Sequence, residues 1–66
     1  MISKRQLEIV LLVGRDGASW AQVSREMACH PSTIRAHVTR IKERLGIKRK
    51  PREAMVIAYH TINNDT

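Results

Sequence analysis

The chain has 66 residues, 42% of them hydrophobic, and a formal net charge of +6. So short a chain has room for one domain, residues 1–66, with a core so small that a partner molecule would add useful buried surface. It has no apolar run near the roughly 20 residues that span a bilayer and no signal-peptide pattern, so we expect a cytoplasmic protein without a membrane partner.

The first predicted helix covers about residues 3–13. Ser3 and Gln6 have the Ser-x-x-Gln spacing of a capping box, in which each side chain bonds the backbone N–H of the other residue. The apolar run over residues 9–13 would also suit a buried strand, but there is no second strand to pair with it, so we interpret it as helix. Two glycines within residues 14–17 then predict a loop.

The second and third predicted helices, about residues 20–27 and 31–45, form a helix-turn-helix. Ser19 and Gln22 repeat the capping-box spacing. Pro31 suits the first turn of a helix, where its missing N–H costs nothing. Two capped amphipathic segments on either side of a three- or four-residue break are typical of this DNA-binding motif.

The third predicted helix has two contrasting sides. Its apolar residues recur at spacings of four, three and four, so they form one stripe: Ile34, Val38, Ile41 and Leu45. The opposite side carries small or polar residues: Ser32, Ala36, Thr39, Arg40 and Glu43. This opposite side is free to contact DNA.

The positive charge is concentrated in residues 35–52. Eight cationic residues stand there against Glu43 alone, which gives the segment a net charge of +7: Arg35, Arg40, Lys42, Arg44, Lys48, Arg49, Lys50 and Arg52. A basic segment that begins on the second helix of a helix-turn-helix favours phosphate binding, because each neutralised phosphate releases condensed counterions. The alternative interpretation is a solvated cationic face.

Gly46 stands where a left-handed C-cap is usual, so the third helix should end at Leu45. A fourth helix, about residues 51–62, is predicted to begin at Pro51. Its apolar stripe consists of Ala54, Met55, Ala58 and Ile62, with Val56 and Tyr59 pointing elsewhere. Two interpretations of this second apolar face stay open. It is either a dimer interface, formed by Val56, Tyr59 and Ile62, or a cap on the small core made by Tyr59.

Four short sequence motifs occur in an order that is hard to obtain by chance. Residues 2–9 read Ile-Ser-Lys-Arg-Gln-Leu-Glu-Ile, and residues 17–24 read Gly-Ala-Ser-Trp-Ala-Gln-Val-Ser. Residues 33–37 read Thr-Ile-Arg-Ala-His, and residues 41–47 contain Ile-x-x-Arg-Leu-Gly-Ile. From residue 2 to about residue 58, the chain resembles the LuxR/GerE-type (NarL-type) DNA-binding domain of bacterial transcription factors, and we expect a freestanding regulator without a sensor domain.

The chain departs from the family pattern at three places. The loop before Gly17 and the linker after Ile47 each carry one extra residue, and His30 replaces a serine at the N-cap of the third helix. If His30 cannot accept the N–H bond, the cap is weaker by roughly 1 kcal/mol.

The resemblance implies an all-α, compact four-helix domain whose third helix lies in the major groove of double-stranded DNA. It implies base contacts from Arg35, Ala36 and Thr39, and phosphate contacts from Arg5, Ser19, Trp20, Ser32, Thr33 and Arg40. Arg35 would pair with guanine O6 and N7, and Ala36 or the Thr39 methyl would contact a thymine methyl. Trp20 replaces a polar family residue, so its indole N–H is the expected donor. Helical spacing alone puts Arg35 to the side, where it can also be a solvated cation.

Other function classes fit the sequence less closely. An enzyme needs convergent groups in a pocket, and this chain offers three scattered histidines and no matching carboxylate pair. A zinc site needs about four ligands, whereas only Cys29 and His30 are adjacent, so we expect no metal and no cofactor. Another alternative is the promoter-binding region of a sigma factor. The Leu-Gly-Ile motif and the predicted helix after Pro51 favour the LuxR type over it.

The sequence therefore predicts a small transcriptional regulator, associated with the bacterial nucleoid, that binds an inverted repeat as a homodimer through its fourth helix. The alternative is a protein-binding module, such as a phage or plasmid product. It would engage RNA polymerase or a host regulator through exposed apolar faces of the first or fourth helix.

Overall fold

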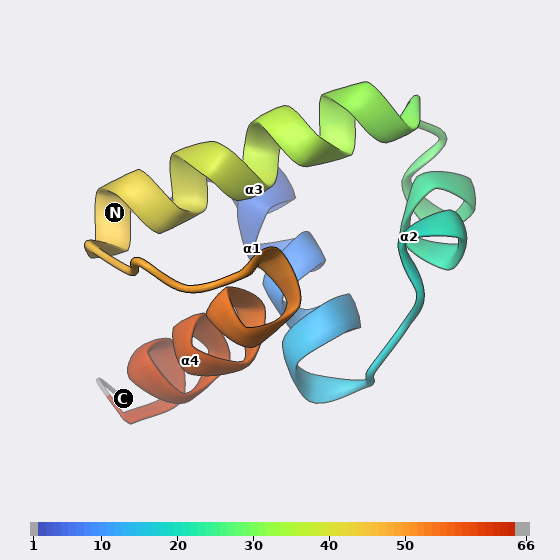
Figure 1. The fold of residues 1–66 in the computed structure, drawn as a ribbon. Helices are drawn as coiled ribbons and strands as arrows, with labels where there is room; N and C mark the ends of the chain where they lie inside the picture. Colours follow the sequence, from blue (N-terminus) through green and yellow to red (C-terminus); the bar gives the residue numbers. More distant parts are fainter. Residues whose placement is uncertain (1, 65–66) are drawn as a thin grey trace.

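Four α-helices and one π-helical segment make up the part of the chain that the computed structural model describes, residues 2–64 (Figure 1). They are α1 (Lys4–Val10), η1 (Leu11–Arg15), α2 (Trp20–Met27), α3 (Pro31–Leu45) and α4 (Pro51–Asn64). These residues contain no strand, so the predicted all-α class and helix-turn-helix are confirmed. No helix within this range has the length and apolar composition needed to cross a membrane.

Both predicted capping boxes are present. The Ser3 hydroxyl accepts the Gln6 N–H at 3.2 Å, and Gln6 Oε1 accepts the Ser3 N–H at 2.9 Å. Ser19 and Gln22 make the same reciprocal pair at 3.1 and 2.9 Å. Because the first N–H groups of a helix have no partner within it, these side chains define where α1 and α2 begin.

Left-handed residues end α2 and α3. Gly46 has φ 67° after α3, as predicted, and the Ile47 N–H then bonds the Lys42 carbonyl at 2.9 Å. Ala28 has φ 52° after α2, a conformation that a residue with a Cβ rarely adopts. The chain can therefore turn from α2 into α3 within the three residues between them.

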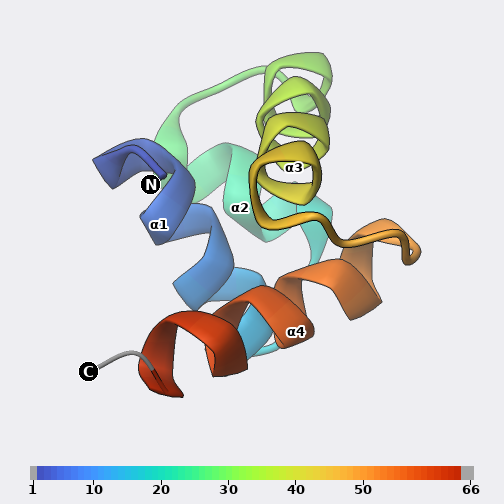
Figure 2. The same cartoon turned by 90° about the vertical axis from the view of Figure 1, so that its left-hand side faces the viewer.

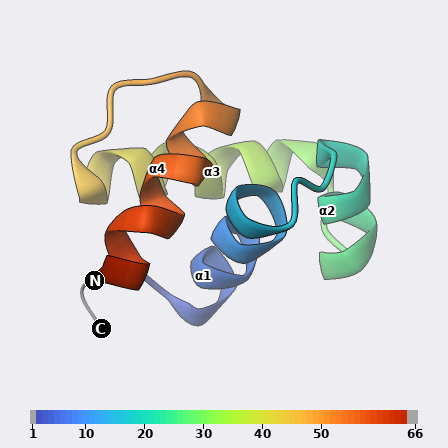
Figure 3. The same ribbon diagram turned by 90° about the horizontal axis from the view of Figure 1, so that it is seen from below.

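The four helices and η1 share one core. Figure 1 shows α3 running across the top of the molecule with α2 at its N-terminal end. In Figure 2, α4 crosses beneath α3, and Figure 3, seen from below, shows α4 crossing in front of α3 with α1 beside it. The buried apolar side chains in the described residues are Ile9, Val10, Val13, Val23, Met27, Ile34, Val38, Ile41, Ala54, Met55 and Ala58. Burying each large one contributes roughly 1.5–3 kcal/mol.

The loop predicted for residues 14–17 begins too early, because the first helical segment continues through η1 to Arg15. Gly14 packs against α4 there. A Cβ on Gly14 would overlap the carbonyl oxygen of Met55 and lie 2.9 Å from Cβ of Tyr59. The absence of a side chain at Gly14 therefore allows η1 and α4 to pack closely. This contact joins distant parts of the chain, so local turn propensity cannot predict it.

This contact also favours the interpretation of Tyr59 as a cap on the small core, one of the two that the sequence left open. Its Cβ lies over Gly14, and its half-buried side chain packs against the core. Ile62 is half-buried on the same core, whereas Val56 is exposed, as predicted. α4 extends two residues beyond the predicted end, to Asn64.

We predict that Gly14→Ala lowers the free energy of unfolding by about 1–3 kcal/mol, because the backbone carbonyl of Met55 must shift. Urea denaturation followed by circular dichroism measures the change. Gly17→Asn is the control: Gly17 has φ 69° with open space around its Cβ position, and asparagine tolerates that conformation. A Gly14→Ala protein as stable as the wild type would contradict the close packing.

Candidate nucleic-acid interface

The outward side of α3 carries the residues that the resemblance assigned to base contacts. Arg35, Ala36 and Thr39 are all exposed, opposite a stripe in which Ile34, Val38 and Ile41 are at most 3% exposed. The buried stripe fixes the rotation of α3 about its axis, so these three side chains must face outward.

Thr39 presents its methyl group and its oxygen lone pairs to a partner. Its Oγ1 donates a hydrogen bond to the Arg35 carbonyl, one turn earlier, at 3.1 Å. The hydroxyl proton is therefore used within the helix. The side chain can contact an apolar group or accept a hydrogen bond without breaking this bond.

His30 caps α3, although the sequence allowed a weakened cap there. Its Nδ1 accepts the Ser32 N–H at 3.1 Å and lies 2.8 Å from Ser32 Oγ. Nδ1 can accept this bond only while it carries no proton. Ser32 and Thr33, two predicted phosphate contacts, are exposed in this first turn. Phosphates favour such a position, since the N-terminus of a helix carries partial positive charge.

Trp20, at the start of α2, is linked to the start of α4. Its half-buried side chain packs against the core, and the Arg52 guanidinium carbon lies 5.3 Å from the centre of the indole ring. Arg52 also donates a hydrogen bond to the Ala18 carbonyl at 2.9 Å. This cation–π contact and hydrogen bond join the N-termini of α2 and α4. The role of Arg52 was missed, although an aromatic in place of a polar family residue was a signal that the indole has a partner.

A cavity of about 240 Å³ lies between α2, α3 and the first residue of α4. Trp20, Arg35, Thr39 and Pro51 are among the residues that line it. The cavity therefore brings two predicted base contacts and one predicted phosphate contact to the same side of the molecule. Ser19, beside Trp20, is exposed, but its hydroxyl oxygen already accepts the capping bond.

Two other predicted phosphate contacts lie away from this cavity. Arg40 is exposed and stands about 140° around the helix axis from Arg35, on the other flank of the outward side. Arg5 is exposed on α1, and its Nη1 donates a hydrogen bond to Cys29 Sγ at 3.1 Å. To reach a phosphate, Arg5 would have to give up this contact with the turn of the helix-turn-helix.

Charge is distributed unevenly over the molecule. Outside the basic segment, Arg15 donates hydrogen bonds of 2.8 and 3.0 Å to Asp16. These bonds lower the pKa of the Asp16 carboxyl below its ordinary value and locally neutralise Arg15. Within residues 35–52, Glu43 is the one acidic residue. The exposed residues of α3 and of the following linker therefore present a cationic surface.

Within the described part of the chain, no three His, Cys, Asp or Glu side chains gather as metal ligands would. His37 is half-buried, and its Nδ1 is buried without a hydrogen-bond partner.

On α4, Val56 and Ile57 are each 38% exposed. Ile57 was not among the residues that the sequence analysis assigned to this surface.

A family model described as bacterial regulatory proteins, luxR family, matches residues 1–58. The match includes all of α1, α2 and α3 and the first half of α4. No curated protein and no solved structure matches the chain. The resemblance found in the sequence is thus confirmed at the level of the family.

We predict that His30→Ala lowers the free energy of unfolding by about 1 kcal/mol, because the Ser32 N–H loses its acceptor. His30→Ser should retain most of the stability. Thermal or urea unfolding of both variants measures the effect, with His60→Ala on the exposed surface of α4 as the control. Equal stability of His30→Ala and wild type would show that the imidazole does not cap α3.

Proposed function

The chain belongs to the luxR family of bacterial regulatory proteins, whose helix-turn-helix domains bind DNA and regulate transcription, and we propose that its α3 reads a specific double-stranded sequence in the major groove. The observation that carries this proposal is the outward side of α3. There, exposed small and cationic side chains stand opposite a fully packed stripe. A helix about 10–12 Å in diameter fits a groove about 12 Å wide.

Arg35, Ala36 and Thr39 are proposed to contact bases. Arg35 can donate two hydrogen bonds to guanine O6 and N7, the acceptor pair that distinguishes guanine in this groove. Ala36 offers only a methyl group, which suits a thymine methyl. Thr39 can act in the same way, since its hydroxyl proton is directed to the Arg35 carbonyl.

The proposed phosphate contacts come mainly from the N-termini of the two helices of the helix-turn-helix. Ser32 and Thr33 lie in the first turn of α3, and Ser19 and Trp20 lie at the start of α2. The Trp20 indole N–H is the proposed donor, while Arg52 covers the ring. Arg40 approaches the backbone from the other flank, and Arg5 is included on the condition that it leaves Cys29.

We further propose that two copies bind an inverted repeat, with α4 as the interface between them. Val56 and Ile57 expose apolar area on α4, whereas Tyr59 and Ile62 contribute only the parts not packed on the core. A two-fold dimer would bury the exposed pair and align two α3 helices with two half-sites. Such a regulator acts on the bacterial nucleoid in the cytoplasm. If α4 instead docks on RNA polymerase or a host regulator, the protein stays monomeric on DNA.

The first test separates base contacts from phosphate contacts on a duplex selected from a random pool. Arg35→Ala should lose about 1–3 kcal/mol of binding free energy and relax the preference at one base pair. Arg40→Ala should weaken selected and random duplexes equally. Fluorescence anisotropy measures both, and circular dichroism checks the fold. If both variants lose the same affinity on both duplexes, the assignment of Arg35 is wrong.

The second test concerns α4. Val56→Glu should shift the protein toward a monomer in sedimentation and weaken binding to the inverted repeat, because a charge would enter an apolar interface. Binding to a single half-site should change little. Thr61→Glu, an exposed position about 140° around α4, is the charge-matched control. A dimer that survives Val56→Glu would exclude this interface.

A further inference from the structure

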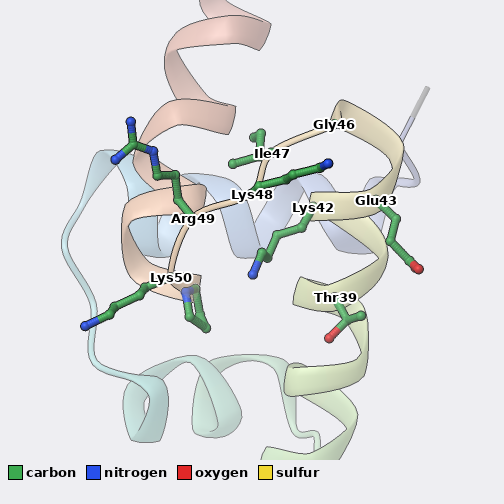
Figure 4. A pocket seen from close by; sticks show the side chains of 9 residues that line it. Thr39, Lys42, Glu43, Gly46, Ile47, Lys48, Arg49 and Lys50 are labelled. Atoms are coloured by element: carbon green, nitrogen blue, oxygen red, sulfur yellow. The ribbon is translucent and has the colours of Figure 1, made fainter.

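A second hollow, of about 860 Å³, lies beside the C-terminal half of α3. One wall is formed by Thr39, Lys42 and Glu43 of α3, and the other by residues 46–50, the linker to α4, together with Pro51 at the start of α4 (Figure 4). We call it the linker hollow. None of the residues assigned to phosphates so far lies in it.

Two lysines extend across the linker hollow from opposite walls. Figure 4 shows Lys42 reaching from α3 toward the linker and Lys48 reaching from the linker toward α3. Lys42 is half-buried, so its aliphatic stem packs while its ammonium group faces the hollow. Arg49 and Lys50 point outward from the linker.

The linker hollow is bordered mainly by neutral and cationic residues. Glu43 is the one acidic residue among those that line it, and Figure 4 shows its side chain turned away from the two lysines. Lys42 and Lys48 thus bring two positive charges to one hollow, and a bound anion would offset their mutual repulsion.

The linker hollow continues the surface proposed to read DNA. Thr39, Lys42 and Pro51 line both this hollow and the smaller cavity beside Trp20 and Arg35. The two hollows therefore open along one side of α3. A duplex bound at Arg35 and Thr39 would therefore also lie beside the linker hollow.

The length of α3 indicates that the sugar-phosphate backbone of the duplex would lie next to the linker hollow. Its 15 residues span about 22 Å at 1.5 Å per residue, whereas the major groove is about 12 Å wide. With the first half of α3 in the groove, the second half extends toward the sugar-phosphate wall. Lysine is a common phosphate ligand because its ammonium group is a mobile point charge.

We propose that Lys42 and Lys48 form a phosphate-binding site for the DNA strand that borders the groove at the C-terminal end of α3. The proposal rests on the proposed function and adds a second set of contacts with the DNA phosphates. The first set of phosphate contacts is at the N-termini of α2 and α3. The linker between α3 and α4 is then part of the interface rather than only a connection.

The test measures binding to a random-sequence 20-base-pair duplex between about 50 and 200 mM salt. Each phosphate contact contributes about 0.9 to the slope of log affinity against log salt, so Lys42→Gln/Lys48→Gln should lower the slope by about 1.8. The affinity change over this salt range would then shrink by about twelvefold. Glutamine is one atom shorter than lysine and removes the charge while staying polar, and circular dichroism checks that the double variant is folded.

Lys4→Gln/Arg25→Gln is the charge-matched control, because it removes two exposed cations from α1 and α2. The proposal requires a clearly smaller slope change for this control. Equal changes in the two double variants would overturn the linker site and leave the proposed function standing. A wild-type protein that does not bind the duplex at low salt would overturn both.

Discussion

The packing of Ile34, Val38 and Ile41 into the shared core is the interaction on which the candidate interface depends. These side chains are 0–3% exposed, and α3 contacts α1, α2 and α4. A rotation of α3 by one residue, about 100°, would drive a charged or polar side chain into the core and expose an apolar one. Core packing on one side of α3 therefore determines which side chains meet a partner on the other.

Features set by neighbouring residues were predictable from the sequence. Both capping boxes, the left-handed Gly46 and the apolar stripe of α3 depend on side chains within a few positions of one another, and all are present. Gly14 is different: its role comes from the approach of α4, some 40 residues later, so its local sequence indicated only a loop. The inward position of Tyr59 follows from the same approach.

The candidate site shows the same division between local and distant effects. Helical spacing placed Ala36 and Thr39 outward on α3, and both are exposed. It could not show that Arg52 is held against Trp20, because 32 positions of chain separate the two residues. It also gave no reason to separate Lys42 and Lys48 from the other cations of the basic segment. Only the path of the linker brings these two lysines to one hollow.

Chemical protection of the bases tests the placement of α3 in the major groove most directly. Dimethyl sulfate methylates guanine N7, which lies in the major groove, and adenine N3, which lies in the minor groove. With a duplex selected by this protein, we expect bound protein to protect guanine N7 at the position read by Arg35 and to leave adenine N3 reactive. Protection confined to adenine N3, with every guanine N7 still reactive, would contradict the placement of α3.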